Sequence, residues 1–320
     1  MKHNPSLTVI VPAWNREGTI GRCLDSIFNQ EYEDYEVIVV DDGSTDGTLA
    51  AIRGYGEDRI IVLCHETNEG KNAALRDAVR VASAEWIVVL DSDDALLPGA
   101  LTKMAELAGR VAQGVGVVGM KMLYDTGETT PDPPLPEGEF GLEEWLRWLD
   151  GAKKADMLLC RRRALLQEIP FPADLRGRAQ MMLRSVARWK FVVSRQAGGM
   201  VHTDAANRLG QHKASLLPLQ AKRDHAIMTE EILQEFGAAL RRFAPRRYFQ
   251  LFFEAGRWYF LAGNRVKGTW WSLRFLARRP WSLRGWGIFA LGLLGPGTML
   301  RVRRVLRRGQ GRAARPTEAS

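Results

Sequence analysis

The sequence contains little cysteine, since only Cys23, Cys64 and Cys160 occur in 320 residues. Their number is odd and their spacing is wide, so a disulfide scaffold is excluded. No CxxC pair is present, which removes the usual cysteine-based metal site. Such sparse cysteines fit a reducing compartment, and we expect a cytoplasmic protein.

The sequence also lacks a long hydrophobic run. Its longest apolar stretch, Trp286–Leu300, is broken by Gly292, Gly295, Pro296 and Gly297. A membrane-spanning helix needs about 20 apolar residues, so we predict no conventional transmembrane helix. The segment Met1–Trp14 has no small-residue cleavage site, and we expect no secretory signal.

Two kinds of catalytic motif are absent. The chain has no GxxxxGK[ST] phosphate loop and no readable Ser/His/Asp or Cys/His arrangement. Its composition, 46% hydrophobic and 26% charged, is that of a globular protein and excludes disorder over most of the chain. The length suits one large α/β domain with an appendage, or two domains.

Acidic residues are scarce at the carboxyl end. From Arg241 onward there are 18 Lys+Arg and two acids, Glu254 and Glu318, which gives +16 for the last 80 residues. The net charge of the whole chain is +8, so residues 1–240 carry −8. This asymmetry indicates an acidic body and a basic region that meets an anionic surface.

Short apolar runs alternate with helical patterns over the first 120 residues. The predicted strands are Leu7–Val11, Val37–Val40, Ile60–Leu63, Trp86–Leu90 and Val115–Met120. The predicted helices between them are Thr19–Asn29, Thr45–Arg53, Lys71–Ala82 and Pro98–Ala112. This order predicts an α/β fold with a doubly wound, mostly parallel sheet flanked by helices.

The rest of the chain is predicted to be mixed and then helical. A strand at Asp156–Cys160, helices at Arg161–Glu168 and Gln180–Trp189, and a strand at Phe191–Ser194 follow the first half. From Leu216 the apolar spacing is helical, and from Gly309 the composition is typical of disorder.

Polar side chains directly follow three of the predicted strands. They are Asn15 and Glu17 after the first strand, Asp41 and Asp42 after the second, and Asp91, Asp93 and Asp94 after the fourth. The carboxyl ends of such strands form the ligand-binding edge of α/β folds. Carboxylates gathered there suit Mg²⁺ or Mn²⁺, which also bind phosphate oxygens. The pattern therefore predicts a metal, a diphosphate and a nucleoside in one cleft.

An ordinary structural explanation exists for each motif taken singly. Asp, Ser and Gly favour turns and helix caps, and Ser44 or Thr45 could cap the next helix. Because both acidic motifs directly follow fully apolar strands, we favour the ligand site.

Four segments resemble the family 2 glycosyltransferases, which have the GT-A fold. They are Thr8–Glu17, Val37–Asp46, Asn68–Ala74 and Trp86–Asp94, in the order and spacing of that family. The resemblance covers about residues 7–120. It implies a GT-A-like domain at 1–215, made of a nucleotide-sugar-binding half (1–120) and an acceptor half (121–215). A helical, basic, membrane-associating region (216–308) and a disordered tail (309–320) would follow.

The resemblance assigns the donor site to the first half. It implies that Pro12, Ala13 and Trp14 line the nucleobase pocket, and that Asp42 accepts a hydrogen bond from a uracil-like base. Glu17 also falls in the donor-binding set, as do Asn68, Gly70 and Lys71, whose loop passes near the diphosphate. The alternative for Lys71 is a solvated residue in a first helical turn.

The resemblance also assigns a metal site. Asp91 and Asp93 form the DxD motif, and one of Asp93 and Asp94 would bind Mg²⁺ or Mn²⁺, with Asp93 as principal ligand. The implied reaction is inverting transfer from a nucleotide-diphosphate sugar, most simply a UDP-sugar, in which a carboxylate removes the proton of the acceptor hydroxyl.

That carboxylate is where the sequence departs from the family. Arg178 and Ala179 stand where an acid pair is expected. Asp174, Asp204 and His202 are the candidates that remain. The alternative for Asp174 is an ordinary loop or cap residue, and the alternative for His202 is a polar residue with its hydrogen bonds satisfied. A non-catalytic nucleotide-sugar-binding or scaffold protein is therefore the chief alternative.

Arginine and tryptophan recur together in the basic region. Half of the 10 tryptophans lie there, namely Trp258, Trp270, Trp271, Trp281 and Trp286. We expect an anionic membrane surface as partner, with the protein peripheral on its cytoplasmic face and a glycan or lipid-linked acceptor. The alternatives are a solvated helix face packed on the body and nucleic-acid binding, which we do not favour.

Overall fold

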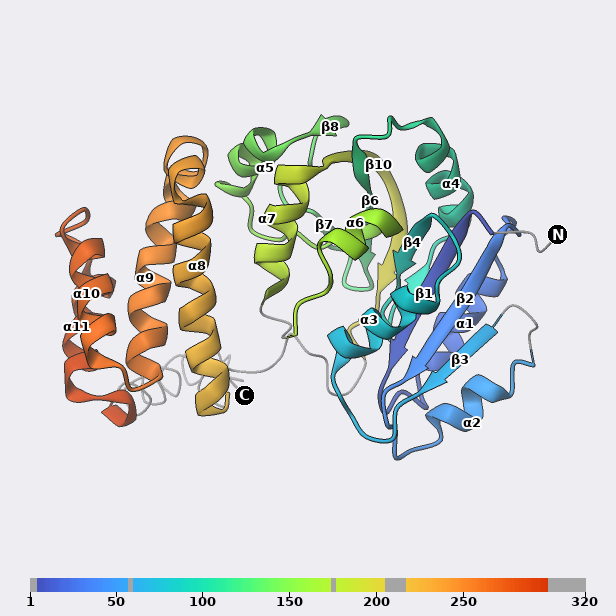
Figure 1. Ribbon diagram of the computed structural model, residues 1–320, viewed down its shortest axis with the longest axis horizontal. Coiled ribbons are helices and arrows are strands. Elements are labelled where there is room, and N and C mark those ends of the chain that lie inside the picture. Colours follow the sequence, from blue (N-terminus) through green and yellow to red (C-terminus); the bar gives the residue numbers. More distant parts are fainter. Residues whose placement is uncertain (1–4, 57–59, 174–176, 205–216, 299–320) are drawn as a thin grey trace, which may run out of the picture. The chain divides into compact units, whose positions relative to one another are not determined.

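A computed structural model of the chain, shown in Figure 1, describes residues 5–56, 60–173, 177–204 and 217–298. The chain divides into two compact units, Met1–Arg208 and Leu209–Ser320. The first unit holds all of the sequence motifs, and the second is helical wherever it is described, apart from short connections. The predicted disordered tail, 309–320, lies outside the described residues.

One ten-stranded sheet forms the centre of the first unit within the described residues, and its main path is β3-β2-β1-β4-β9-β6-β10-β5. In that order the strands are Ile60–Cys64, Tyr35–Asp41, Leu7–Ala13, Trp86–Val89, Leu158–Arg162, Val115–Tyr124, Lys190–Val201 and Ala95–Leu96. Off the path, β7 (Thr129–Thr130) pairs with β6, and β8 (Gly138–Phe140) pairs with β10.

Parallel pairing places the predicted site. Strands β3, β2, β1 and β4 are parallel neighbours, and β10 is parallel to β6. Strand β9 runs antiparallel to both β4 and β6. The α/β class and the doubly wound sheet are thus confirmed. The carboxyl ends of β1, β2, β3 and β4 meet at one edge, as the sequence predicted.

Helices cover both faces of this sheet. They are α1 (Ile20–Phe28), α2 (Thr48–Arg53), α3 (Lys71–Val81), α4 (Ala100–Arg110), α5 (Leu142–Leu149), α6 (Arg163–Glu168) and α7 (Arg178–Arg188). Val9 and Val11 of β1 pack with Leu24 of α1 and Met104 of α4 in one buried core, as alternation along a strand requires. Helix α3 contacts β1 and β2.

The later strands differ from the prediction at their ends. The strand expected at Phe191–Ser194 is β10, which runs from Lys190 to Val201. The added part of the strand includes Gly198 and Gly199, where the absence of a side chain lets the neighbouring strand come close. A Cβ on Gly199 would lie 2.5 Å from the sulfur of Met122 in β6.

The second unit is a group of four helices within residues 217–298. They are α8 (Leu219–Phe243), α9 (Pro245–Leu261), α10 (Arg265–Leu276) and α11 (Leu283–Leu294), coloured orange to red in Figure 1. Their shared core contains Phe252, Trp258, Phe260, Trp271 and Phe275. None of the described helices combines the length and the apolar character needed to cross a bilayer.

Candidate functional site

The loops after β1 and β2 are joined by hydrogen bonds. The amide of Asn15 donates to Ser44 Oγ at 2.9 Å, and the amide of Thr45 donates to Asn15 Oδ1 at 2.9 Å. The carboxylate of Glu17 accepts from the amide of Gly47 at 3.0 Å. Glu17, which was expected in the donor-binding set, therefore positions the loop that follows Asp42.

Asp42 organises the loop before α3. Its side chain is buried, and its carboxylate accepts from the amides of Glu69 at 2.9 Å and Gly70 at 2.8 Å. Nδ1 of His65 lies 2.8 Å from the same carboxylate. Within the described residues, these contacts use three of the about four acceptor positions of a carboxylate. Asn68 is exposed on this loop.

His65 lies between two carboxylates, although its sequence context suggested no role. Nδ1 faces Asp42, and Nε2 lies 3.3 Å from Asp77 on α3. Burial lowers the pKa of His65, but the hydrogen bond to Asp42 and the charges of Asp42, Glu69 and Asp77 raise it above its ordinary value. Both ring nitrogens can donate only in the imidazolium form. The sequence could have indicated this position, because His65 directly follows β3 and so lies at the same sheet edge as Asp42.

The predicted nucleobase residues lie at the end of β1. Pro12 and Ala13 are buried, whereas Trp14 is 41% exposed. The amide of Asp42 donates to the carbonyl of Ala13 at 2.8 Å, which joins the ends of β1 and β2. Gly43 follows with φ 68°, and a Cβ there would lie 2.5 Å from the backbone of Thr67. A glycine is needed at that position for both reasons.

Three carboxylates converge after β4. One oxygen from each of Asp91, Asp93 and Asp94 can be chosen so that all lie within 4.8 Å of one another. Asp93 and Asp94 are buried, and Asp91 is partly exposed. This hard, anionic oxygen set fits Mg²⁺ or Mn²⁺. The structure therefore brings together the residues predicted to hold a metal.

Lys71 belongs to this cluster. Its ammonium group, on a side chain only 12% exposed, contacts Asp91 Oδ1. Burial raises the pKa of Asp91, but the charge and hydrogen bond of Lys71, together with the charges of Arg178 and Arg16, hold that pKa below its ordinary value. The alternative of a solvated lysine in the first helical turn is therefore wrong.

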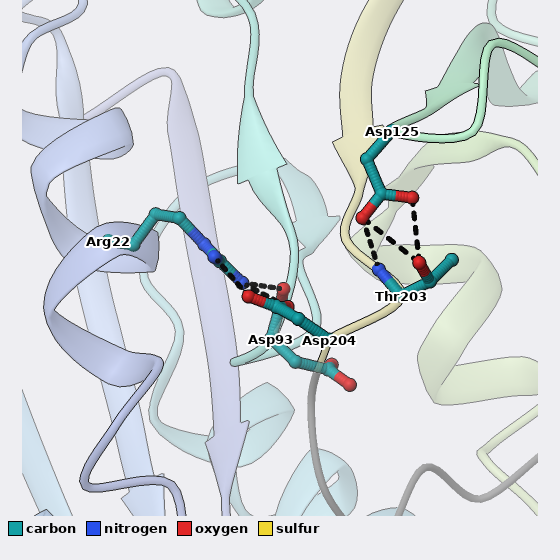
Figure 2. Close-up of polar contacts among 5 residues, drawn as sticks. All are labelled: Arg22, Asp93, Asp125, Thr203 and Asp204. Atoms are coloured by element: carbon teal, nitrogen blue, oxygen red, sulfur yellow. Dashed lines mark hydrogen bonds and ion pairs between the residues drawn. The ribbon is translucent and has the colours of Figure 1, made fainter.

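Arg22 of α1 links the end of β10 to the acidic loop (Figure 2). Its guanidinium donates to both carboxylate oxygens of Asp204 at 3.0 Å and to the backbone carbonyl of Asp93 at 3.2 Å. The hydrogen bond from Arg22 lowers the pKa of Asp204. Beside it, Thr203 donates to Asp125 through its amide at 2.6 Å and its hydroxyl at 2.9 Å.

The general base expected of a transferase has no clear candidate among the described residues. Asp204 is engaged by Arg22, and its lowered pKa argues against a base that works best near neutral pH. His202 follows β10 and is partly buried. Asp174 lies outside the described residues. Helix α7 begins at Arg178 and carries no acid in its first turn.

Comparison with known proteins matches residues 8–166 to the family described as Glycosyl transferase family 2. The succinoglycan biosynthesis protein ExoO of Rhizobium meliloti (strain 1021) is 35% identical over 113 residues, 35% of this chain and 32% of that protein. The poly(ribitol-phosphate) beta-glucosyltransferase of Bacillus spizizenii (strain ATCC 23059 / NRRL B-14472 / W23) is 32% identical over 145 residues, 42% of this chain and 23% of that protein. The matches thus span a third or less of these relatives.

Solved structures agree on the fold. Crystal structures of S. aureus TarS resemble the chain with a TM-score of 0.62 and 20% identity, covering 90% of this chain and 54% of that one. TarS 1-349 in complex with UDP-GlcNAc gives a TM-score of 0.58 and 23% identity, covering 90% and 81%. At this identity the likeness shows a shared fold and nothing further.

Proposed function

Because the chain belongs to the family 2 glycosyltransferases, a family of transferase enzymes, we propose that it moves a sugar from a nucleotide-diphosphate sugar to a glycan acceptor. One observation carries this proposal: Asp91, Asp93 and Asp94 converge after β4, at the sheet edge where Asp42 follows β2. The edge thus offers a cation site and, at Asp42, a hydrogen-bond acceptor for a nucleobase. A nucleoside diphosphate needs both.

The proposed donor is a UDP-sugar. The remaining acceptor position on Asp42 suits an imide N–H such as that of uracil. Trp14 is exposed at the end of the neighbouring strand β1 and offers an apolar surface for the base. Mg²⁺ or Mn²⁺, held by Asp93 with Asp91 and Asp94, would offset the charge of the leaving diphosphate. Lys71 holds Asp91, and Arg22 holds the backbone at Asp93, so the two ends of the motif keep their places. We propose inversion at the reacting carbon.

The proposed acceptor is lipid-linked or part of a cell-surface polysaccharide. One relative, 36% identical over 107 residues, is the GalNAc(5)-diNAcBac-PP-undecaprenol beta-1,3-glucosyltransferase of Campylobacter jejuni subsp. jejuni serotype O:2 (strain ATCC 700819 / NCTC 11168). An acceptor of that kind lies at a membrane. The exposed Trp281, Leu283 and Leu294 of the basic second unit suit the cytoplasmic face of an anionic membrane.

A second candidate function is binding without transfer. The observation that favours it is the start of α7, where Arg178 and not a carboxylate occupies the first helical position. Such a protein would hold the nucleotide-sugar but would not deprotonate an acceptor.

Thermal denaturation with UDP-sugars, with and without Mn²⁺, tests donor binding. A ligand at about 100 times its dissociation constant adds about 2.7 kcal/mol to the free energy of unfolding, so a clear rise in Tm is expected. Asp93→Asn should lose the Mn²⁺-dependent part of that rise. Asp156→Asn, which changes a carboxylate outside the cluster, should keep it. An Asp93→Asn protein that responds like wild type would contradict the metal assignment.

Release of UDP separates transfer from binding. Wild-type protein with a UDP-sugar, Mn²⁺ and a polyprenyl-diphosphate-linked oligosaccharide should release UDP and extend the oligosaccharide. Tight donor binding without UDP release above that of the Asp93→Asn protein would favour the non-catalytic candidate.

A further inference from the structure

A small cavity in the first unit lies beside the end of β4, between β9 and α7. Its volume is about 60 Å³, and its lining includes Arg161 of β9 and Arg178 of α7. Val89, Phe171 and Met181 supply apolar side chains around these two arginines. Two cations in a mainly apolar lining call for a negative charge, because buried charges are normally paired.

Arg161 has no anionic partner in the described part of the chain. Its guanidinium lies over the ring of Phe171 instead, with Cζ 5.8 Å from the ring centroid. Burial, and then the charge of Arg178, lower the pKa of Arg161 to about 10. The group is still charged at neutral pH, so the protein holds a cation there without a counter-ion from these residues.

Arg178 is held in place by a neutral group. Its Nε and Nη2 donate to Oδ1 of the buried Asn72 at 3.2 and 3.1 Å, which leaves further N–H groups of the guanidinium for another acceptor. Arg178 is also the first residue of α7, whose N-cap is Gly177 and whose first turn has no acid. The positive end of the helix dipole therefore adds to the charge of the two arginines.

We propose that this cavity binds a phosphate-class oxyanion carried by the acceptor, an inference that rests on the proposed transferase function. Arginine forks match the oxygens of phosphate, and the apolar lining strengthens charge-assisted hydrogen bonds. The arginines come from residues after 157, whereas every donor motif lies before residue 95. The anion thus belongs to the acceptor side. Burial lowers the pKa of Arg178, and the charge of Asp91 in the neighbouring donor cluster offsets only part of that lowering.

Inorganic phosphate is the probe, titrated into the full chain at constant ionic strength against chloride. Phosphate should raise the Tm of wild-type protein. Arg161→Met, which removes no side-chain hydrogen bond within the described residues, should weaken apparent phosphate affinity by about tenfold or more, the effect of losing one charge-assisted contact. Arg188→Met is the matched control, because Arg188 ends the same helix and pairs with Glu168 at the surface. It should respond like wild type.

Two further arms make the outcome decisive. Arg178→Gln should lose the phosphate response as well, and it replaces Arg161→Met if that variant does not fold. Saturating UDP with Mn²⁺ should leave phosphate affinity unchanged, since competition would assign the cavity to the donor diphosphate and overturn the acceptor assignment. Asp93→Asn should lose metal-dependent donor binding but keep the phosphate response. Donor binding and phosphate binding are thus measured independently, so one proposal can fail without the other. Equal phosphate affinity in wild type and Arg161→Met would overturn the proposal.

Discussion

Two carboxylates at the binding edge are matched with basic side chains from different elements. Asp42 after β2 faces His65 after β3, and Asp91 after β4 faces Lys71 at the start of α3. Without such partners the carboxylates would repel one another in a site of low dielectric. The proposed diphosphate and its cation would then enter a site in which the charges of Asp42 and Asp91 are already paired.

His65 gives this balance a pH dependence. Its folded-state pKa is raised, so its stabilising contribution is full below its ordinary pKa of about 6.5 and is lost as pH rises through the raised value. The stability difference between wild type and His65→Gln should therefore be largest near pH 6 and shrink above it. Tm measured for both proteins across this range checks the sign.

Asp77→Asn is the companion variant for that measurement. It removes the carboxylate that faces Nε2 and leaves Asp42 in place. In the Asp77→Asn background, the stability difference between proteins with His and with Gln at position 65 should disappear at a lower pH. With Asp77 present, the same difference should persist to a higher pH. A difference that grows with pH would contradict the imidazolium assignment.

Single residues were predicted well where the chemistry is local and poorly where it depends on a distant partner. Asp91, Asp93 and Asp94 converge as expected, because a strand end fixes them within a few residues. The Lys71–Asp91 pair spans 20 positions, and the Arg22–Asp204 pair spans 182. No spacing rule indicates such pairs, which follow from the order of strands in the sheet.

At the scale of elements, glycine decides how closely α11 approaches its neighbours. A Cβ on Gly292 would lie 2.3 Å from the ring of Phe260 on α9. Gly287 on the same helix has no atom within 4 Å of such a Cβ. Two glycines five residues apart therefore have opposite roles, one required by packing and one not.

This contrast predicts opposite effects on stability. Gly292→Ala should lower the free energy of unfolding of the second unit by about 1–3 kcal/mol, because the added methyl group would overpack the core around Phe260. Gly287→Ala should leave it unchanged or raise it by about 0.5–1 kcal/mol through helix propensity. Urea denaturation followed by tryptophan fluorescence compares the two. Equal effects would contradict the packing of α11 on α9.

Helices and strands with a regular pattern of apolar residues were predicted, and strands whose apolar pattern is interrupted were not predicted in full. Strands β1, β2 and β4 are near-continuous apolar runs, so their position within a few residues was evident. β10 passes through Gly198 and Gly199 and pairs irregularly with β6, which no alternation of side chains indicates. The antiparallel direction of β9 depends on its neighbours β4 and β6.

At the scale of the whole molecule, charge and exposed apolar side chains gather in the second unit. Trp258 and Trp271 are buried in its core, so they are unavailable to a membrane, contrary to the expectation for all five tryptophans. Trp281 and Leu283 are 81% and 87% exposed. The tryptophans therefore divide into packing residues and surface residues, a division that composition does not reveal.

Membrane association should depend on the surface residues alone. Deleting α11 is a poor test, because Ile288 and Phe289 pack against the core of the second unit. The double variant Trp281→Ser/Leu283→Ser leaves that core intact. It should weaken binding to anionic phosphatidylserine vesicles by tenfold or more, since each large side chain moved from water into the interface contributes about 1.5–3 kcal/mol.

Leu219→Ser/Ile227→Ser on α8 is the matched control, since it also removes two exposed apolar side chains, which are 50% and 48% exposed. Co-sedimentation with vesicles should be unchanged in this control. High salt should weaken binding of wild type only in part, because it screens the arginines but not the apolar contacts. If Trp281→Ser/Leu283→Ser sediments as well as wild type, these residues do not enter a membrane, and the basic surface acts through charge alone or meets another partner.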